Sequence, residues 1–170
     1  MNRIGIAGAT LFFLAHMPTG PLAAQDHAAH HPAAPAATND SSFRALQQRG
    51  AGTMGVDQYA SRHRFEDLPD GGRIELQMRE ADSAAVTAIR AHLRKTVAEF
   101  QEGVFTAPEA THAMVVPGTA VMAAKKGKIR YAYRDLAQGG EIRISTNDAE
   151  ALAAIREFLE FQRSDHRTGH

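Results

Sequence analysis

The sequence predicts a two-layer α+β domain, in which two long helices cover one face of a four-stranded, mostly antiparallel sheet. A turn-like phrase occurs twice, as Asp67-Leu68-Pro69-Asp70-Gly71-Gly72 and as Asp135-Leu136-Ala137-Gln138-Gly139-Gly140. A second pair of similar sequences follows, one after each turn, as Ala88-Ile89-Arg90-Ala91-His92-Leu93 and as Ala154-Ile155-Arg156-Glu157-Phe158-Leu159. The repeated unit is therefore strand, turn, strand, helix, and we expect an internal ββα duplication with halves at about 58–103 and 128–166.

In the first half, strands are expected at 58–68 and 73–78, joined by a hairpin whose glycines supply positive backbone angles. A helix capped by Asp82 or Ser83 follows and runs to about Gly103. Its apolar residues recur at three- and four-residue spacing, which predicts a single buried stripe. The stripe consists of Val86, Ile89, Leu93, Val97 and Phe100.

The second half repeats this order, with strands expected at 128–136 and 141–146 and a helix that begins after Asn147 or Asp148 and ends near His166. The buried stripe of this helix consists of Leu152, Ile155, Leu159 and Gln162, broadened by Phe158 and Phe161. Between the halves, 103–128 reads as a long connection with a turn of helix at 119–124. A short helix from Ser42 to Gly50 precedes the first strand.

The N-terminal region predicts export. Arg3 precedes an apolar run at 4–14 that is too short to span a bilayer, and small residues end at Ala24, so 1–24 is read as a signal peptide. Residues 25–40 are rich in Ala, Pro and His and are expected to be a disordered lead to a single domain at 41–170. We expect a periplasmic or secreted protein with no stable membrane anchor after cleavage.

Composition excludes some classes of function. The chain has 19 basic and 19 acidic residues, so it lacks the excess positive charge typical of nucleic-acid binding. It has no cysteine, which excludes disulfides and thiolate chemistry.

Alignment of the sequences of the two halves shows where they differ. His63 in the first half falls opposite Tyr131 in the second, and His92 falls opposite Phe158. If the aromatic residues face the core, the histidines occupy inward positions where they need polar partners or a ligand. The functional residues should therefore lie at these differences.

Imidazole, carboxylate and thioether groups together suit a copper or zinc site in an oxidising compartment. The leading ligand candidates are His63, His92 and His112, with support from Asp57, Met54 or Met114. The spacing matches no known metal motif, so the alternative is that each histidine is a core residue bonded to backbone or carboxylate. Asp57 is equally a turn former, and His166 is explained by the dipole at a helix C-terminus.

His27 is a separate candidate. After cleavage at Ala24 it would be the third residue, and a terminal amine, two backbone amides and an imidazole form a square-planar nitrogen set that suits Cu(II) or Ni(II). The alternative is that this short histidine tract binds no metal.

The chain also resembles a group of small exported bacterial proteins of uncharacterised function. The resemblance rests on the following residues: Met54-Gly55-Val56-Asp57-Gln58, His63-Arg64-Phe65, the double-Gly hairpin, Ile89-Arg90-Ala91-His92-Leu93, His112, Pro117-Gly118 and Phe158-Leu159-Glu160-Phe161-Gln162 with His166. It implies an exported protein and no particular reaction.

The sequence therefore predicts an exported, non-catalytic metal-binding protein that takes copper first and zinc second. The alternative is a non-enzymatic binding or interaction module with structural histidines. An exported hydrolase comes third, because the chain contains no Gly-x-Ser-x-Gly, Ser-x-x-Lys or phosphate-loop motif.

Overall fold

The computed structural model describes residues 36–168. The elements follow one another as α1 (Ala36–Met54), β1 (Ser61–Leu68), β2 (Gly71–Met78), α2 (Ser83–Gln101), α3 (Thr106–His112), α4 (Thr119–Ala124), the 3₁₀ helix η1 (Lys126–Lys128), β3 (Ile129–Leu136), β4 (Gly139–Thr146) and α5 (Ala149–Asp165).

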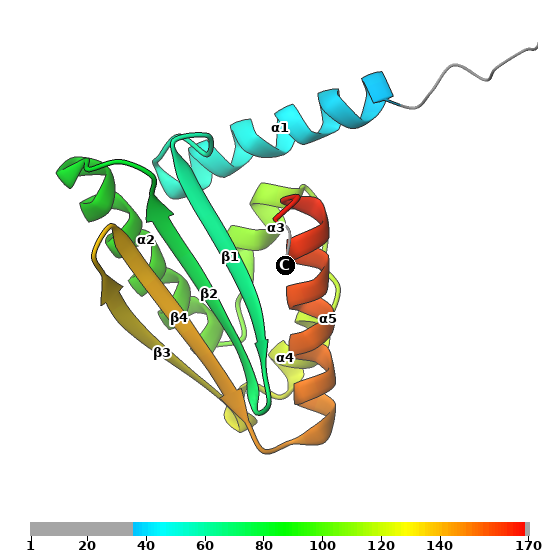
Figure 1. Cartoon of the computed structure of the whole chain (residues 1–170). Helices are drawn as coiled ribbons and strands as arrows, with labels where there is room; N and C mark the ends of the chain where they lie inside the picture. Colours follow the sequence, from blue (N-terminus) through cyan, green and yellow to red (C-terminus); the bar gives the residue numbers. More distant parts are fainter. Residues whose placement is uncertain (1–35, 169–170) are drawn as a thin grey trace, which may run out of the picture. The chain divides into compact units, whose positions relative to one another are not determined.

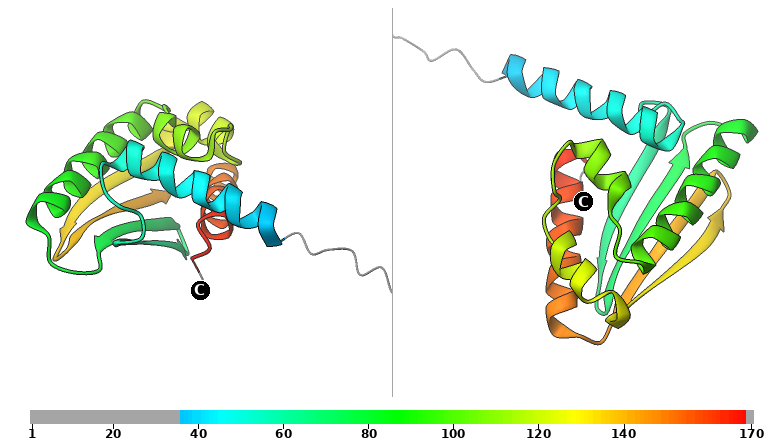
Figure 2. Two further views of the ribbon diagram at one scale, coloured as in Figure 1. Left: turned by 90° about the horizontal axis from the view of Figure 1, so that it is seen from above. Right: turned by 180° about the vertical axis from the view of Figure 1, so that it is seen from behind.

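The four strands form one antiparallel sheet in the order β1-β2-β4-β3. The two hairpins therefore meet through their second strands, with Ile74 of β2 opposite Ile142 of β4. All helices lie on one side of the sheet, as Figures 1 and 2 show. The predicted two-layer α+β fold is confirmed, whereas the internal duplication stays a prediction.

Each long helix lies mainly over the hairpin of the other half. α2 packs on β3 and β4, whereas α5 packs on β1 and β2 (Figure 1). The predicted stripe of α2 is buried along its whole length, and Asp82 caps the helix by accepting a hydrogen bond from Ala85 N–H. Asp148 caps α5 in the same way, accepting from Ala151 N–H at 3.0 Å.

The paired glycines have a different role from the one expected. The turns are Pro69-Asp70 and Ala137-Gln138, and the glycines are the first residues of β2 and β4. Of the four, only Gly71 has a positive φ. A Cβ on Gly71 would lie 2.2 Å from Ile144 O, and a Cβ on Gly139 would lie 2.0 Å from Leu76 O. Gly71 and Gly139 therefore permit the close approach of β2 and β4.

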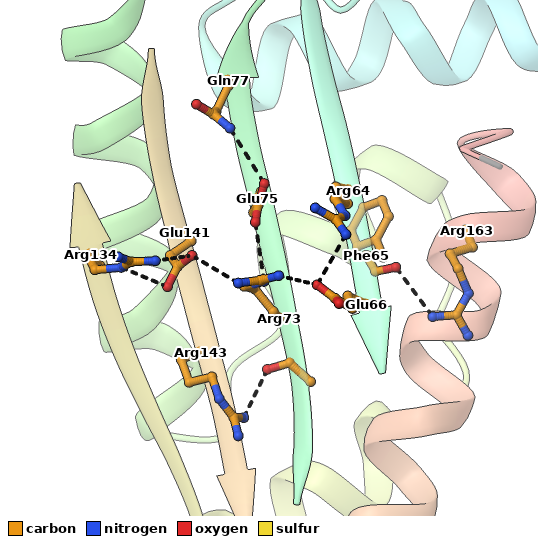
Figure 3. A network of polar contacts seen from close by, with 11 residues as sticks. Arg64, Phe65, Glu66, Arg73, Glu75, Gln77, Arg134, Glu141, Arg143 and Arg163 are labelled. Atoms are coloured by element: carbon orange, nitrogen blue, oxygen red, sulfur yellow. Dashed lines mark hydrogen bonds and ion pairs between the residues drawn. The ribbon is translucent and has the colours of Figure 1, made fainter. Parts of the chain in front are cut away.

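The outer face of the sheet is covered by paired charges (Figure 3). Arg73 contacts Glu66 and Glu75, and Arg134 binds Glu141 through two hydrogen bonds of 3.0 Å. Glu141 is only 6% exposed, so its carboxylate depends on this bidentate partner.

Two helices differ from the expected elements. α1 begins at Ala36 and extends to Met54, so residues 36–40, assigned to the lead, form its first turns. The connection between the halves contains α3, which was not expected, and α4, which was. The predicted signal peptide, His27 and most of the lead lie outside the described residues. Within 36–168 no helix is long and apolar enough to cross a membrane.

Gly118 supplies a test of the packing between α4 and α5. Its φ is 80°, and an added Cβ would lie 2.2 Å from Ala154 O. We predict that Gly118→Ala lowers the free energy of unfolding by about 2–4 kcal/mol, because backbone strain and overpacking add. Urea denaturation measures this loss. Gly127→Ala is the matched control, because a Cβ there meets no atom within 4 Å; equal losses in both variants would contradict this account.

Candidate functional site

A cavity of about 60 Å³ lies between the inner face of the sheet and helices α2, α3 and α5. Its walls are mainly apolar, and four histidines interrupt them. His63 comes from β1, His92 from α2, His112 from α3, and His166 from the end of α5. We call this space the imidazole cavity. Three of its histidines are the leading candidates from the sequence, and the structure brings them together.

Local structure explains how each ring reaches the cavity. His63 lies two residues from the buried Ser61 and Phe65 along β1, so it shares their inward face. His112 is the last residue of α3, which ends because Ala113 adopts a left-handed conformation with φ of 56°. His166 caps α5 at its C-terminus, where its backbone N–H donates to Gln162 O at 3.0 Å.

Three of the rings form a continuous row. The ring centroids of His63 and His166 are 4.8 Å apart, and those of His112 and His166 are 5.1 Å apart. Phe65 stacks on His63 at 5.6 Å and also contacts His166. His166 is thus the central member of the row.

His112 is held at both ring nitrogens. Its Nδ1 donates to Asp165 Oδ2 at 2.5 Å, and its Nε2 lies 3.0 Å from Gln162 Oε1. The Gln162 amide has nearly the same shape in both orientations, so its nitrogen can take the place of the oxygen and donate to Nε2. The carboxylate fixes which nitrogen of His112 carries the proton and how the ring is oriented.

His63 and His166 make no hydrogen bond to any residue in the range 36–168 through their rings. Burial is the main cause that lowers the pKa of His63 to about 4, with smaller contributions from the nearby His92 and His112. Burial likewise lowers the pKa of His166 to about 2, with a smaller contribution from His63. Both rings are therefore neutral at physiological pH, with a lone pair on one nitrogen.

His92 occupies the side of the cavity formed by α2. Its Nε2 lies 3.4 Å from Thr96 Oγ1 one helical turn away. Burial is the main cause of its lowered pKa. Met54, at the end of α1, also lines the cavity and is 7% exposed, so its thioether is the one sulfur among the lining residues.

The remaining sequence candidates lie elsewhere. Asp57 is exposed, and its Oδ1 accepts from Tyr59 N–H at 2.7 Å, which is the turn-forming role that was considered for it. Met114 is 50% exposed and does not line the cavity.

Three members of the site were not assigned to it from the sequence: His166, Asp165 and Gln162. His166 was explained by the helix dipole alone. Gln162 offered a signal, because a polar residue stood in the apolar stripe of the last helix. It is 4% exposed in the structure.

The side chains as they stand do not form a metal-binding geometry. Among residues 36–168 no group of three or more His, Cys, Asp or Glu side chains is placed to hold a metal ion. Among the same residues no serine hydroxyl is hydrogen-bonded to any of the four histidines, as a serine nucleophile would need.

Comparison with known proteins adds no assignment. No protein-family model, curated protein or solved structure gives a significant match to this chain. Functional inference therefore depends on the geometry of the imidazole cavity.

The lowered histidine pKa values predict how stability depends on pH. A histidine that is neutral when folded takes up a proton on unfolding below its ordinary value of 6.5, so stability is full above 6.5 and falls as the pH drops toward the folded value of about 4. We predict that the metal-free protein loses about 1.4 kcal/mol per pH unit for each such histidine in this window. Urea denaturation from pH 7 to about pH 4.5 measures the slope.

His166→Phe is the informative variant, because it keeps an aromatic ring and removes one titrating group. The slope of stability against pH should decrease by the contribution of about one proton, which is about 1.4 kcal/mol per pH unit. An unchanged slope would show that His166 is not the group responsible. The carboxylates of Asp135 and Asp148 start from an ordinary value of 3.8 and have lowered pKa values, so their contribution falls at lower pH.

Proposed function

We propose that this protein binds a metal ion, copper first and zinc second, in the imidazole cavity. His63, His166 and His112 are the proposed ligands, with the Met54 thioether in support. The observation that carries the proposal is the row of His63, His166 and His112 rings inside an apolar cavity. As predicted from the sequence, we propose that the protein acts outside the cytoplasm and does so without catalysis.

The size of the cavity favours an ion over an organic ligand. One water molecule needs roughly 10–15 Å³ of such space, so 60 Å³ holds a few waters or one ion with a small ligand. Pockets for drug-sized molecules are several times larger, at roughly 300–1,000 Å³.

The protonation state of the rings also supports the proposal. Metal ions bind the neutral imidazole, so a histidine with an ordinary pKa must first lose its proton near neutral pH. Burial has already lowered the pKa values of His63 and His166, and neither ring makes a hydrogen bond within the described range. Their lone pairs are thus available without the loss of a hydrogen bond.

The contact between His112 and Asp165 matches a recurrent feature of metal sites. A ligating histidine usually donates its other ring N–H to a carboxylate, which fixes the ring and raises its basicity. Here Asp165 accepts from Nδ1, which leaves Nε2 as the donor atom toward the metal. Gln162 would have to release Nε2 when the metal enters.

The donor set distinguishes copper from the harder metals. No Asp or Glu lines the cavity, whereas Met54 does. Thioether and imidazole ligands suit Cu(I), and a carboxylate-free apolar site disfavours Mg²⁺ and Ca²⁺. Zn²⁺ remains the second choice because imidazole suits it as well.

A second candidate is a binding or interaction module in which the histidines are structural. It is favoured by the lack of a preformed three-ligand group within 36–168. Metal binding requires the rings to rotate toward a common centre. The two candidates therefore differ in a measurable quantity, the affinity for Cu(I).

We predict that Met54→Leu weakens Cu(I) binding by at least tenfold and leaves Zn²⁺ binding nearly unchanged, because it removes the soft ligand and keeps the volume. Anaerobic competition with a colorimetric Cu(I) chelator measures the affinity. All chains should carry His27→Ala, so that the predicted N-terminal copper site does not contribute.

Met114→Leu is the matched control, since Met114 is exposed and outside the cavity. It should bind Cu(I) like the parent chain. A His63→Phe variant should no longer bind Cu(I) in the imidazole cavity, although it should remain folded. Unchanged Cu(I) stoichiometry and affinity in both Met54→Leu and His63→Phe would exclude the cavity site and favour the structural alternative.

The role of Asp165 is tested separately. Asp165→Asn keeps the shape of the side chain but removes the charge that orients His112, so we predict a loss of about 10- to 100-fold in metal affinity. The same competition assay measures it, with Asp57→Asn as the control for an exposed carboxylate. A larger effect of Asp57→Asn would contradict the assignment of Asp165.

A further inference from the structure

A second hollow, of about 480 Å³, lies outside the imidazole cavity between α1, the start of β1 and the residues that follow α5. Three arginines line it, namely Arg62, Arg79 and Arg167, and we call it the arginine hollow. His63 and His166 line both spaces, so they separate the arginine hollow from the imidazole cavity.

The positive charge of these arginines is not balanced by acidic residues in the walls of the hollow. None of the residues that line it is an Asp or a Glu. Arg167 pairs with Asp40 at 3.5 Å and lies over the Phe43 ring at 4.2 Å. Arg79 donates from Nε to Tyr59 O, which leaves its two terminal nitrogens toward solvent or a ligand.

Arg62 has no ion pair within the described part of the chain. The outer face of the sheet provides the contrast, because Arg73 and Arg134 contact carboxylates there (Figure 3). Arg143 on the same face pairs with Asp70. Guanidinium groups gathered without carboxylates form an anion-attracting surface.

Buried hydroxyl groups give an independent indication. Ser61 is 1% exposed, and its Oγ has no hydrogen-bond partner, although the residue lines the hollow. Thr168 Oγ1 is likewise buried without a partner. Buried hydroxyls are usually satisfied, so two unsatisfied ones beside arginines indicate a missing hydrogen-bond acceptor. Both can donate to an oxyanion.

We propose that the arginine hollow binds the oxyanion group, carboxylate or phosphate, of a small organic molecule. Arg62 and Arg79 supply the charge, and Ser61 and Thr168 donate hydrogen bonds. Gln58 Oε1, also buried without a partner at this hollow, accepts from a hydroxyl or amino group on the same molecule or from a bound water. The volume of the hollow fits such a ligand.

The site is tested by calorimetric titration of the full, metal-stripped chain with inorganic phosphate and with citrate, in a chloride buffer. At least one of them should bind with 1:1 stoichiometry and a Kd at or below about 1 mM. Glycerol is the uncharged control. Binding of phosphate alone assigns a phosphate-bearing ligand, and binding of citrate alone assigns a carboxylate; binding of neither overturns the proposal.

Variants then locate the site. Arg62→Gln combined with Arg79→Gln should weaken binding by at least tenfold, and Ser61→Ala by severalfold, because hydrogen bonds to charged groups are strong. Arg156→Gln is the matched control, since Arg156 is exposed on α5 and lies outside the hollow. An equal loss in the control overturns the proposal. Because no metal is present, this result stands apart from the copper test, and the arginine variants should retain Cu(I) stoichiometry.

Discussion

The close pairing of β2 with β4 is the interaction on which the rest of the structure depends. Glycines at the starts of both strands leave no room for a Cβ beside the opposite backbone, so the two hairpins join into one sheet. The joined sheet has one apolar face, and each long helix covers it over the hairpin of the other half. Neither half can therefore bury its own hairpin alone, and the fold forms from both together.

This arrangement produces the imidazole cavity. β1 and the end of α5 lie side by side because α5 crosses to the first hairpin, and α3 closes the remaining side. His63, His112 and His166 are separated by about fifty residues each in the sequence and are brought within ring contact. Burial lowers the pKa values of His63 and His166, so both rings are neutral at physiological pH, which suits the metal binding that we propose.

Periodicity and turn chemistry predicted the sheet, both long helices and their caps, because those signals act over a few residues. The stripe of α2 was correct at every residue, and each cap was one of the two residues expected, Asp82 and Asp148. The comparison of the halves also identified His63 and His92 as inward positions. His166 and Asp165 could not be assigned, since their role arises from contacts across about a hundred and about fifty residues, which local patterns do not encode. α3 was missed because a seven-residue helix carries almost no periodic signal.

The position of His166 has a consequence for how the two spaces affect each other. The ring that links His63 to His112 comes from the last few described residues, and Thr168 of the arginine hollow follows it directly. The imidazole cavity and the arginine hollow therefore share two wall residues, His63 and His166. A rotation of either ring changes the walls of both spaces at once, so a molecule bound in one space alters the shape of the other.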